Sequence, residues 1–159
     1  MLCGLIGREP LALIYDVCFT SFLFEGNHIS LVAQDIVSEP EEFEVYGVKV
    51  ISESGNKGYL IGEKGKSYKT IFQRKKISNI GLIKCELSDE WAETGERFQM
   101  SFVSGVILEV EGTYFPAYTK PYGYGFFDHG LSSLVTKTES LKLALNGGEF
   151  YQSSVKWCV

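Results

Sequence analysis

Asp128 and His129, followed by Ser132 and Ser133, are the one group in the sequence that could supply a carboxylate, an imidazole and a hydroxyl together. Nucleophilic catalysis needs a base within hydrogen-bonding reach of the hydroxyl and a third group that orients the base. Adjacent residues in an extended loop usually point apart, so Asp128 is poorly placed to orient His129. We therefore favour a solvated loop histidine, and a hydrolase that uses His129 is kept as an alternative.

A second candidate for chemistry is Gly65-Lys66-Ser67, which matches the end of the G-x-x-x-x-G-K-S phosphate-binding loop. That loop requires a glycine at position 60, where this chain has Leu60, and a helix after the serine. The residues that follow Ser67 have the pattern of a strand. We therefore do not expect nucleotide binding by this route.

Four cysteines are widely scattered, at positions 3, 18, 85 and 158, without a C-x-x-C pair or a nearby pair of histidines. This spacing argues against a zinc site, and nothing else in the sequence calls for a cofactor. Two disulfides are possible in a secreted chain. Cys18, Cys85 and Cys158 lie in alternating apolar segments, so we expect buried thiols.

The segment 57–76 is strongly basic, whereas the whole chain carries a net charge of −5. Tyr68 and Phe72 lie among its cations, a pattern typical of a groove for single-stranded nucleic acid. A lysine-rich edge hairpin that resists aggregation, or one that pairs with the acidic remainder, gives the same pattern. Because an acidic molecule repels a polyanion, we expect no nucleic-acid binding.

Acidic turns and an aromatic segment are the remaining features that could form a binding surface. Seven of the fourteen residues at 114–127 are aromatic and alternate with proline and glycine. Rings in a loop either cover the open end of a β-core or form a contact surface. The acidic groups lie in the segments 35–44 and 86–96. The candidate binding residues are Tyr118, Tyr122, Tyr124, Phe126, Phe127, Glu41, Glu42, Glu44, Asp89, Glu90, Trp91 and Glu93.

These residues would be carried mainly by strands, because bulky side chains alternate with a period of two along most of the chain. We expect hairpin turns at Gly26-Asn27 and at Ser104-Gly105, a short helix at 88–95 and a loop at 115–130, while 131–138 fits helix or strand. The expected strands are 11–24, 29–36, 43–51, 59–61, 67–74, 80–87, 97–103, 106–114, 141–145 and 150–159.

With 159 residues and a hydrophobic content of 45%, the chain is long enough for one domain, 1–159, with its own core. Short connections favour antiparallel pairing. The sequence therefore predicts a mainly β protein: an antiparallel sandwich or partly open barrel of roughly ten strands with at most one or two short helices. No apolar segment is long enough for a membrane span, and the first ten residues lack the features of a secretory signal. We expect a soluble, cytoplasmic protein.

The function we expect is non-enzymatic binding of another protein. The acidic turns would attract a basic partner, and the aromatic side chains would supply buried contact area. A small inhibitor of the immunity type, which neutralises a toxin- or nuclease-like partner, has these properties. The main alternative is a β-barrel that binds a small apolar or aromatic ligand beneath the 115–130 loop. The oligomeric state is left open.

Overall fold

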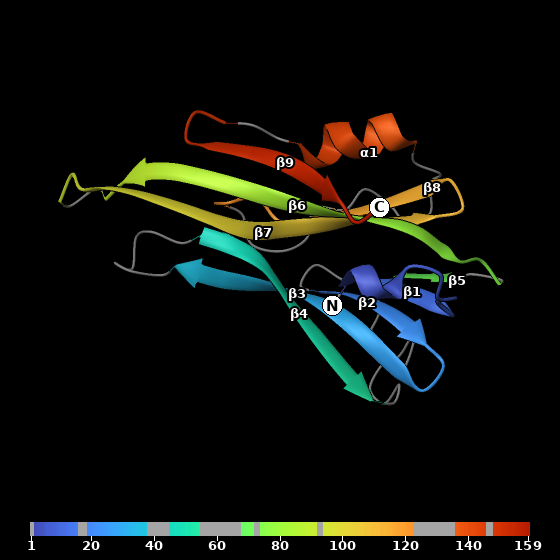
Figure 1. Ribbon diagram of the computed structural model, residues 1–159. Coiled ribbons are helices and arrows are strands. Elements are labelled where there is room, and N and C mark those ends of the chain that lie inside the picture. The colour runs from blue at the N-terminus through green and yellow to red at the C-terminus, as the bar shows by residue number, and fades with distance from the viewer. Residues whose placement is uncertain are drawn as a thin grey trace.

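The computed structural model describes residues 2–15, 19–37, 45–54, 68–71, 74–91, 94–122, 136–145 and 148–159. Nine strands, one α-helix and one 3-10 turn lie within these ranges. The strands form two antiparallel sheets packed face to face (Figure 1). In the described part of the chain, the first and last strands of each sheet do not pair with each other, so neither sheet closes into a barrel. The mainly β, sandwich-like prediction is confirmed, whereas the count of roughly ten strands is not.

The five-stranded sheet has the order β4-β3-β2-β1-β5. The predicted hairpin in its centre is confirmed: β2 and β3 pair across a turn in which Gly26 has a φ of +82°, a conformation that favours glycine. The segment 11–24, expected as one strand, is divided between two. The strands are β1 Ala12–Tyr15, β2 Phe19–Phe24, β3 Asn27–Val37, β4 Val45–Ser54 and β5 Tyr68–Ile71.

The four-stranded sheet has the order β8-β7-β6-β9 and is dominated by the long hairpin of β6 and β7. The turn predicted at Ser104-Gly105 is wrong, because β7 passes straight through these residues with an irregularity in its pairing to β6. The hairpin turn from β7 to β8 lies instead at Glu111 and Gly112, which have φ values of 45° and 83°. The strands are β6 Ile77–Glu90, β7 Arg97–Val110, β8 Thr113–Tyr118 and β9 Tyr151–Trp157.

Gly105 is required for close packing rather than for a turn. A Cβ atom at this position would lie 2.4 Å from the carbonyl oxygen of Ala117 and 2.6 Å from the Cα atom of Tyr118. The glycine therefore allows β8 to approach β7 at the irregularity.

Three further predictions are corrected by the pairing pattern. The helix expected at 88–95 is wrong at its start, because β6 continues to Glu90 and the Ser88 N–H donates to the Phe150 carbonyl at 2.8 Å. The loop expected at 115–130 begins later, since β8 extends to Tyr118. The strand expected at 141–145 is instead the end of a helix. The strand expected at 59–61 lies outside the described residues.

That helix, α1 (Lys137–Ala144), lies over the outer face of the four-stranded sheet (Figure 1). Thr136 and Glu139 form a capping box: the Glu139 N–H donates to the Thr136 hydroxyl at 3.2 Å, and the Glu139 carboxylate accepts from the Thr136 N–H at 2.9 Å. The backbone hydrogen bond holds the pKa of Glu139 below its ordinary value. Leu141 anchors the helix by packing on Ile83 and Ile107. No helix among the described residues is long and apolar enough to cross a membrane.

Thirteen buried apolar residues fill the space between the sheets. Leu13 and Phe22 from the five-stranded sheet meet Ile80 and Val106 from the other sheet. The turn η1 (Leu2–Leu5) also contributes to this cluster, through both of its leucines. The full cluster is Leu2, Leu5, Leu13, Phe22, Phe24, Ile29, Leu31, Ile77, Ile80, Val106, Leu108, Val110 and Phe115.

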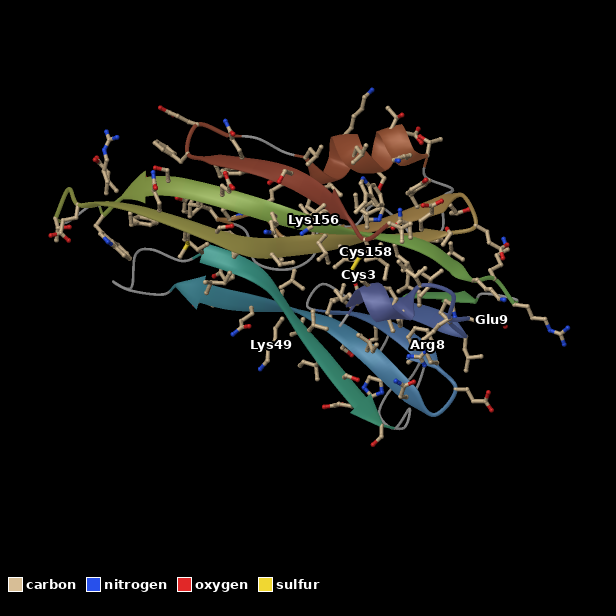
Figure 2. The ribbon with its side chains drawn as sticks, viewed as in Figure 1. Cys3, Arg8, Glu9, Lys49, Lys156 and Cys158 are labelled. Carbon is tan, nitrogen blue, oxygen red and sulfur yellow. A yellow bond between two sulfur atoms is a disulfide. The ribbon has the colours of Figure 1, made fainter. Side chains whose placement is uncertain are left out.

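Cys3 in η1 and Cys158, just after β9, form a disulfide across 155 residues of sequence (Figure 2). The prediction of a buried free thiol is therefore wrong for Cys158 and confirmed for Cys85. Cys18 lies outside the described residues. The pairing could not be inferred from the local pattern, because it depends on the two ends of the chain meeting at the sandwich.

Candidate functional site

The end of the β6–β7 hairpin projects beyond β3 and β4 (Figure 1). Along β6, Ile80 and Leu82 face the core between the sheets. Because side chains alternate along a strand, Glu86, Ser88 and Glu90 lie on the same face further along, and there they are exposed. This face of β6 thus changes from apolar to polar toward the end of the strand.

The other face of the same strand stays buried as far as Leu87. Ile83, Cys85 and Leu87 are buried there, and Ile83 packs against Tyr118. Burial raises the pKa of the Cys85 thiol to about 11; the hydrogen bond with Ser153 opposes this rise and the charge of Glu86 adds to it. The thiol is protonated at neutral pH, which makes it a poor nucleophile. The projecting hairpin is therefore anchored on one face and open on the other.

Tyr122 joins the aromatic segment to the acidic end of β6. Its hydroxyl donates a hydrogen bond to Oδ2 of Asp89. The preceding residues hold the chain in place, since the Thr119 N–H donates to the Ser104 carbonyl at 2.7 Å and the Pro121 carbonyl accepts from the Tyr46 N–H at 2.9 Å. Burial, with further contributions from the hydrogen bond and charge of Asp89, raises the pKa of Tyr122 well above its ordinary value. The phenol thus remains a donor at physiological pH.

Further aromatic rings flank this contact. The rings of Trp91 and Phe98 are 4.9 Å apart between centroids, close enough to stack at the tip of the hairpin. Phe150 at the start of β9 is 46% exposed, and Tyr122 is 47% exposed. We call the group Asp89, Glu90, Trp91, Phe98, Tyr122 and Phe150 the hairpin-end surface.

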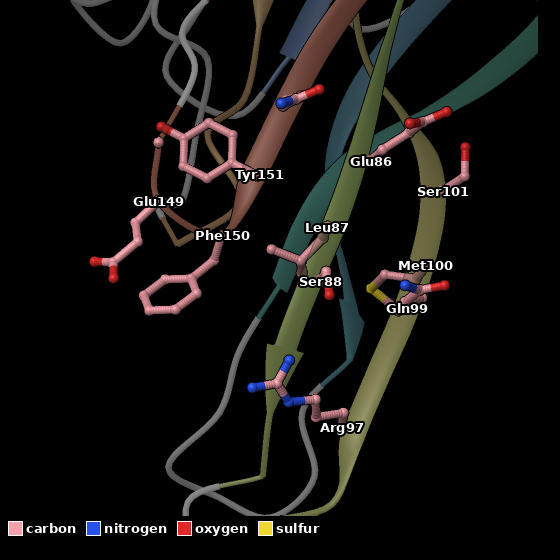
Figure 3. Close-up of a pocket in the computed structure, with 12 residues that line it drawn as sticks. Glu86, Leu87, Ser88, Arg97, Gln99, Met100, Ser101, Glu149, Phe150 and Tyr151 are labelled. Carbon is pink, nitrogen blue, oxygen red and sulfur yellow. The ribbon is translucent and has the colours of Figure 1, made fainter.

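A cleft of about 790 Å³ lies beside this surface, at the ends of β6, β7 and β9 (Figure 3). The exposed side chains of Glu86, Ser88, Gln99, Ser101 and Gln152 contribute to its lining. A smaller cleft of about 220 Å³ shares Ser88, Arg97 and Phe150 with it and adds Asp89 and Glu90. Together we call them the polar cleft.

The charge of the polar cleft is predominantly negative. Four carboxylates line its two parts, and Arg97 is the one cation among the lining residues. Within the described part of the chain, no group of three or more His, Cys, Asp or Glu side chains is arranged to hold a metal ion. The excess of carboxylates over cations in the lining suits a positively charged group. The carboxylates are Glu86, Asp89, Glu90 and Glu149.

The structure brings together only part of the predicted binding set. Asp89, Glu90, Trp91 and Tyr122 meet at one end of the sheet, although they were identified from two separate segments. Tyr118 is 4% exposed and belongs to the packing beneath α1, so it forms core rather than contact surface. The other predicted residues, and His129 of the hydrolase alternative, lie outside the described residues: Glu41, Glu42, Glu44, Glu93, Tyr124, Phe126 and Phe127.

Sequence reasoning missed Phe150, Arg97 and Gln99. Phe150 follows the Asn146-Gly147-Gly148 turn signal and begins the last predicted strand, so an exposed ring beside a turn was the available signal. Nothing local marks Arg97 or Gln99, since their role depends on which face of β7 is left uncovered.

No protein-family model, no curated protein and no solved structure matches this chain.

Proposed function

We propose that this chain is a non-enzymatic protein-binding module whose hairpin-end surface docks on a basic partner protein. The form of this function that we favour is a small inhibitor of the immunity type, which neutralises a toxin- or nuclease-like partner. The proposal depends on one observation: exposed rings and carboxylates from three separate segments converge at the projecting end of the four-stranded sheet.

The composition of this surface supports binding to a protein. Aromatic side chains provide large contact areas at a low cost in conformational entropy, and they are enriched among residues that dominate binding energy. Tyr122 and Phe150 are half exposed, so each ring has area left to bury. The surrounding carboxylates accelerate association with a positively charged surface.

The small-ligand alternative finds less support. A barrel-type binding protein needs an interior cavity, whereas the described space between the sheets holds the thirteen-residue apolar cluster. The clefts lie instead at the ends of β6, β7 and β9. The hydrolase alternative stays a prediction, because His129 is outside the described residues.

The compartment also bears on this proposal. Localisation in the cytoplasm stays a prediction, and the Cys3–Cys158 disulfide is the observation that argues against it. Structural disulfides persist mainly in oxidising surroundings, such as the periplasm or the outside of the cell. A basic protein in an oxidising compartment would fit the proposed partner as well as a cytoplasmic one would.

The proposal is tested by affinity capture at low salt with the wild type and two charge-reversal variants. Glu90→Arg changes the hairpin-end surface, and Glu25→Arg changes an exposed turn between β2 and β3. We expect the wild type and Glu25→Arg to retain the same basic protein and Glu90→Arg to lose it, because reversing a charge at the contact removes attraction and adds repulsion.

The captured protein is then purified and its association rate is measured at rising ionic strength. We expect the rate to fall several-fold between low and physiological salt. Equal capture by Glu90→Arg and the wild type, or capture of no basic protein by folded wild type, would contradict the proposal.

A further inference from the structure

We propose that the polar cleft binds an extended segment of the partner and that an arginine of this segment enters its smaller part, between Asp89, Glu90 and Phe150. This inference rests on the proposed function for the nature of the ligand. It adds a location at the end of the projecting hairpin and a chemical group that is recognised there.

The shape of the cleft favours an extended chain. Its larger part, of about 790 Å³, is open and is formed by the ends of three neighbouring strands. The side chains of Gln99, Ser101 and Gln152 are exposed there and can donate or accept hydrogen bonds from a peptide backbone. Polar side chains spaced along a surface can form hydrogen bonds with the N–H and C=O groups of an extended peptide. A ligand that inserted only one compact side chain would not need such a row of groups.

The charge of the cleft favours a basic segment. Four carboxylates and one guanidinium line the two parts, so the lining carries three net negative charges. Nucleic acid and anionic lipid surfaces carry negative charge and are repelled by this lining. A positively charged peptide is the class of ligand with complementary charge.

The smaller part of the cleft combines the two kinds of group that bind a guanidinium. Asp89 and Glu90 lie at successive positions, and the Phe150 ring lines the same space of about 220 Å³. A guanidinium is planar, so it can stack on a ring while its N–H groups donate to carboxylate oxygens. An ammonium group is compact and strongly hydrated and gains less from the ring. This geometry predicts a preference for arginine over lysine.

Arg97 opposes the binding of any cation, arginine or lysine, through its own positive charge. It faces Glu90 across the β6–β7 pair. Removing the charge of Arg97 is expected to strengthen binding of a basic peptide.

The test uses a hexa-arginine peptide as the probe, with hexa-lysine and hexa-glutamate for comparison, and follows backbone amide signals of the intact protein by NMR. We expect hexa-arginine to shift amides at 86–90, 97–101 and 148–152, to bind more tightly than hexa-lysine, and to compete with the partner. Hexa-glutamate should leave these amides unchanged.

Matched variants separate the parts of the site. Glu90→Gln is expected to weaken hexa-arginine binding about fivefold, as expected for loss of one partly exposed charge pair. Phe150→Leu should reduce the arginine-over-lysine preference, because it removes the ring and keeps an apolar side chain. Arg97→Gln should strengthen binding, and Glu25→Gln should leave it unchanged.

Several results would overturn the inference. They are hexa-arginine shifts confined to other parts of the protein, equal affinities for hexa-arginine and hexa-lysine, or unchanged binding in Glu90→Gln. If these occur while Glu90→Arg still loses a basic partner, only this inference fails. If hexa-arginine binds as expected and no basic protein is captured, only the proposed function fails.

Discussion

At the scale of single residues, the contact between Tyr122 and Asp89 fixes the arrangement of the hairpin-end surface. The phenol is half exposed, yet it donates to a carboxylate at the far end of β6 and its pKa is raised. This hydrogen bond holds the ring near the strand, although the residue stays 47% exposed. The contact is thus structural and also shapes the hairpin-end surface.

The raised pKa of Tyr122 makes the stability of the folded protein fall at alkaline pH. The pKa of Tyr122 is above its ordinary value of 10.0 in the folded protein, so the stabilisation is complete below pH 10.0. It is lost as the pH rises further, because the unfolded chain then releases a proton that the folded protein retains. We expect the free energy of unfolding to fall less steeply above pH 10.0 in Tyr122→Phe than in the wild type. Urea unfolding across this range measures both slopes, and parallel slopes would show that the phenol contributes nothing.

At the scale of elements, the approach of β8 to β7 depends on the absence of a side chain at Gly105. We expect Gly105→Ala to destabilise the protein by about 2 kcal/mol, because the added Cβ meets backbone atoms that cannot move independently of the strand pair. Thermal and urea unfolding measure the loss. Gly4→Ala is the matched control, since nothing lies within 4 Å of a Cβ at that position. Similar stabilities for Gly105→Ala and the wild type would show that the two strands separate at little cost.

Gly105 also shows which parts of the fold were predictable. Alternation identifies strands wherever one face is buried, and it located the β2–β3 hairpin and β9. A serine and glycine within such a pattern predict a turn, whereas here the glycine serves the packing of a neighbouring strand. Likewise, Ser88 and the acids after it satisfy the local rules for a helix start, but pairing with β7 and β9 provides more hydrogen bonds to the same backbone.

The hairpin-end surface was predictable in four of its six members and not in its assembly. Asp89, Glu90, Trp91 and Tyr122 stand out by composition alone. Their proximity depends on the length of β6 and on the path of 119–121 between β4 and β7, both of which are set by long-range hydrogen bonds. Tyr118 looked equivalent to Tyr122 in the sequence, but its position opposite Gly105 places it beneath α1.

At the scale of the whole molecule, the Cys3–Cys158 disulfide joins the two ends of the chain at the sandwich. Cys3 lies in the turn whose leucines enter the core. Cys158 follows β9, and its N–H donates to the Ile80 carbonyl at 2.8 Å. The bond therefore links the core-filling turn to the edge of the four-stranded sheet. The same sheet carries the polar cleft at the opposite end of β6 and β9.

Closing a loop that spans almost the whole chain removes many conformations from the unfolded state. Because the cysteines are 155 positions apart in the sequence, we expect the disulfide to contribute about 4 kcal/mol to stability, the upper part of the usual range. Reduction of the wild type should lower the thermal midpoint. The Cys3→Ser/Cys158→Ser double variant should show the lower midpoint at once and be insensitive to reductant, which separates loss of the bond from other effects of the reagent. Peptide mapping without reductant should recover Cys3 and Cys158 in one linked fragment. Free thiols at both positions in a folded protein would contradict the assignment and would restore the case for a reducing compartment.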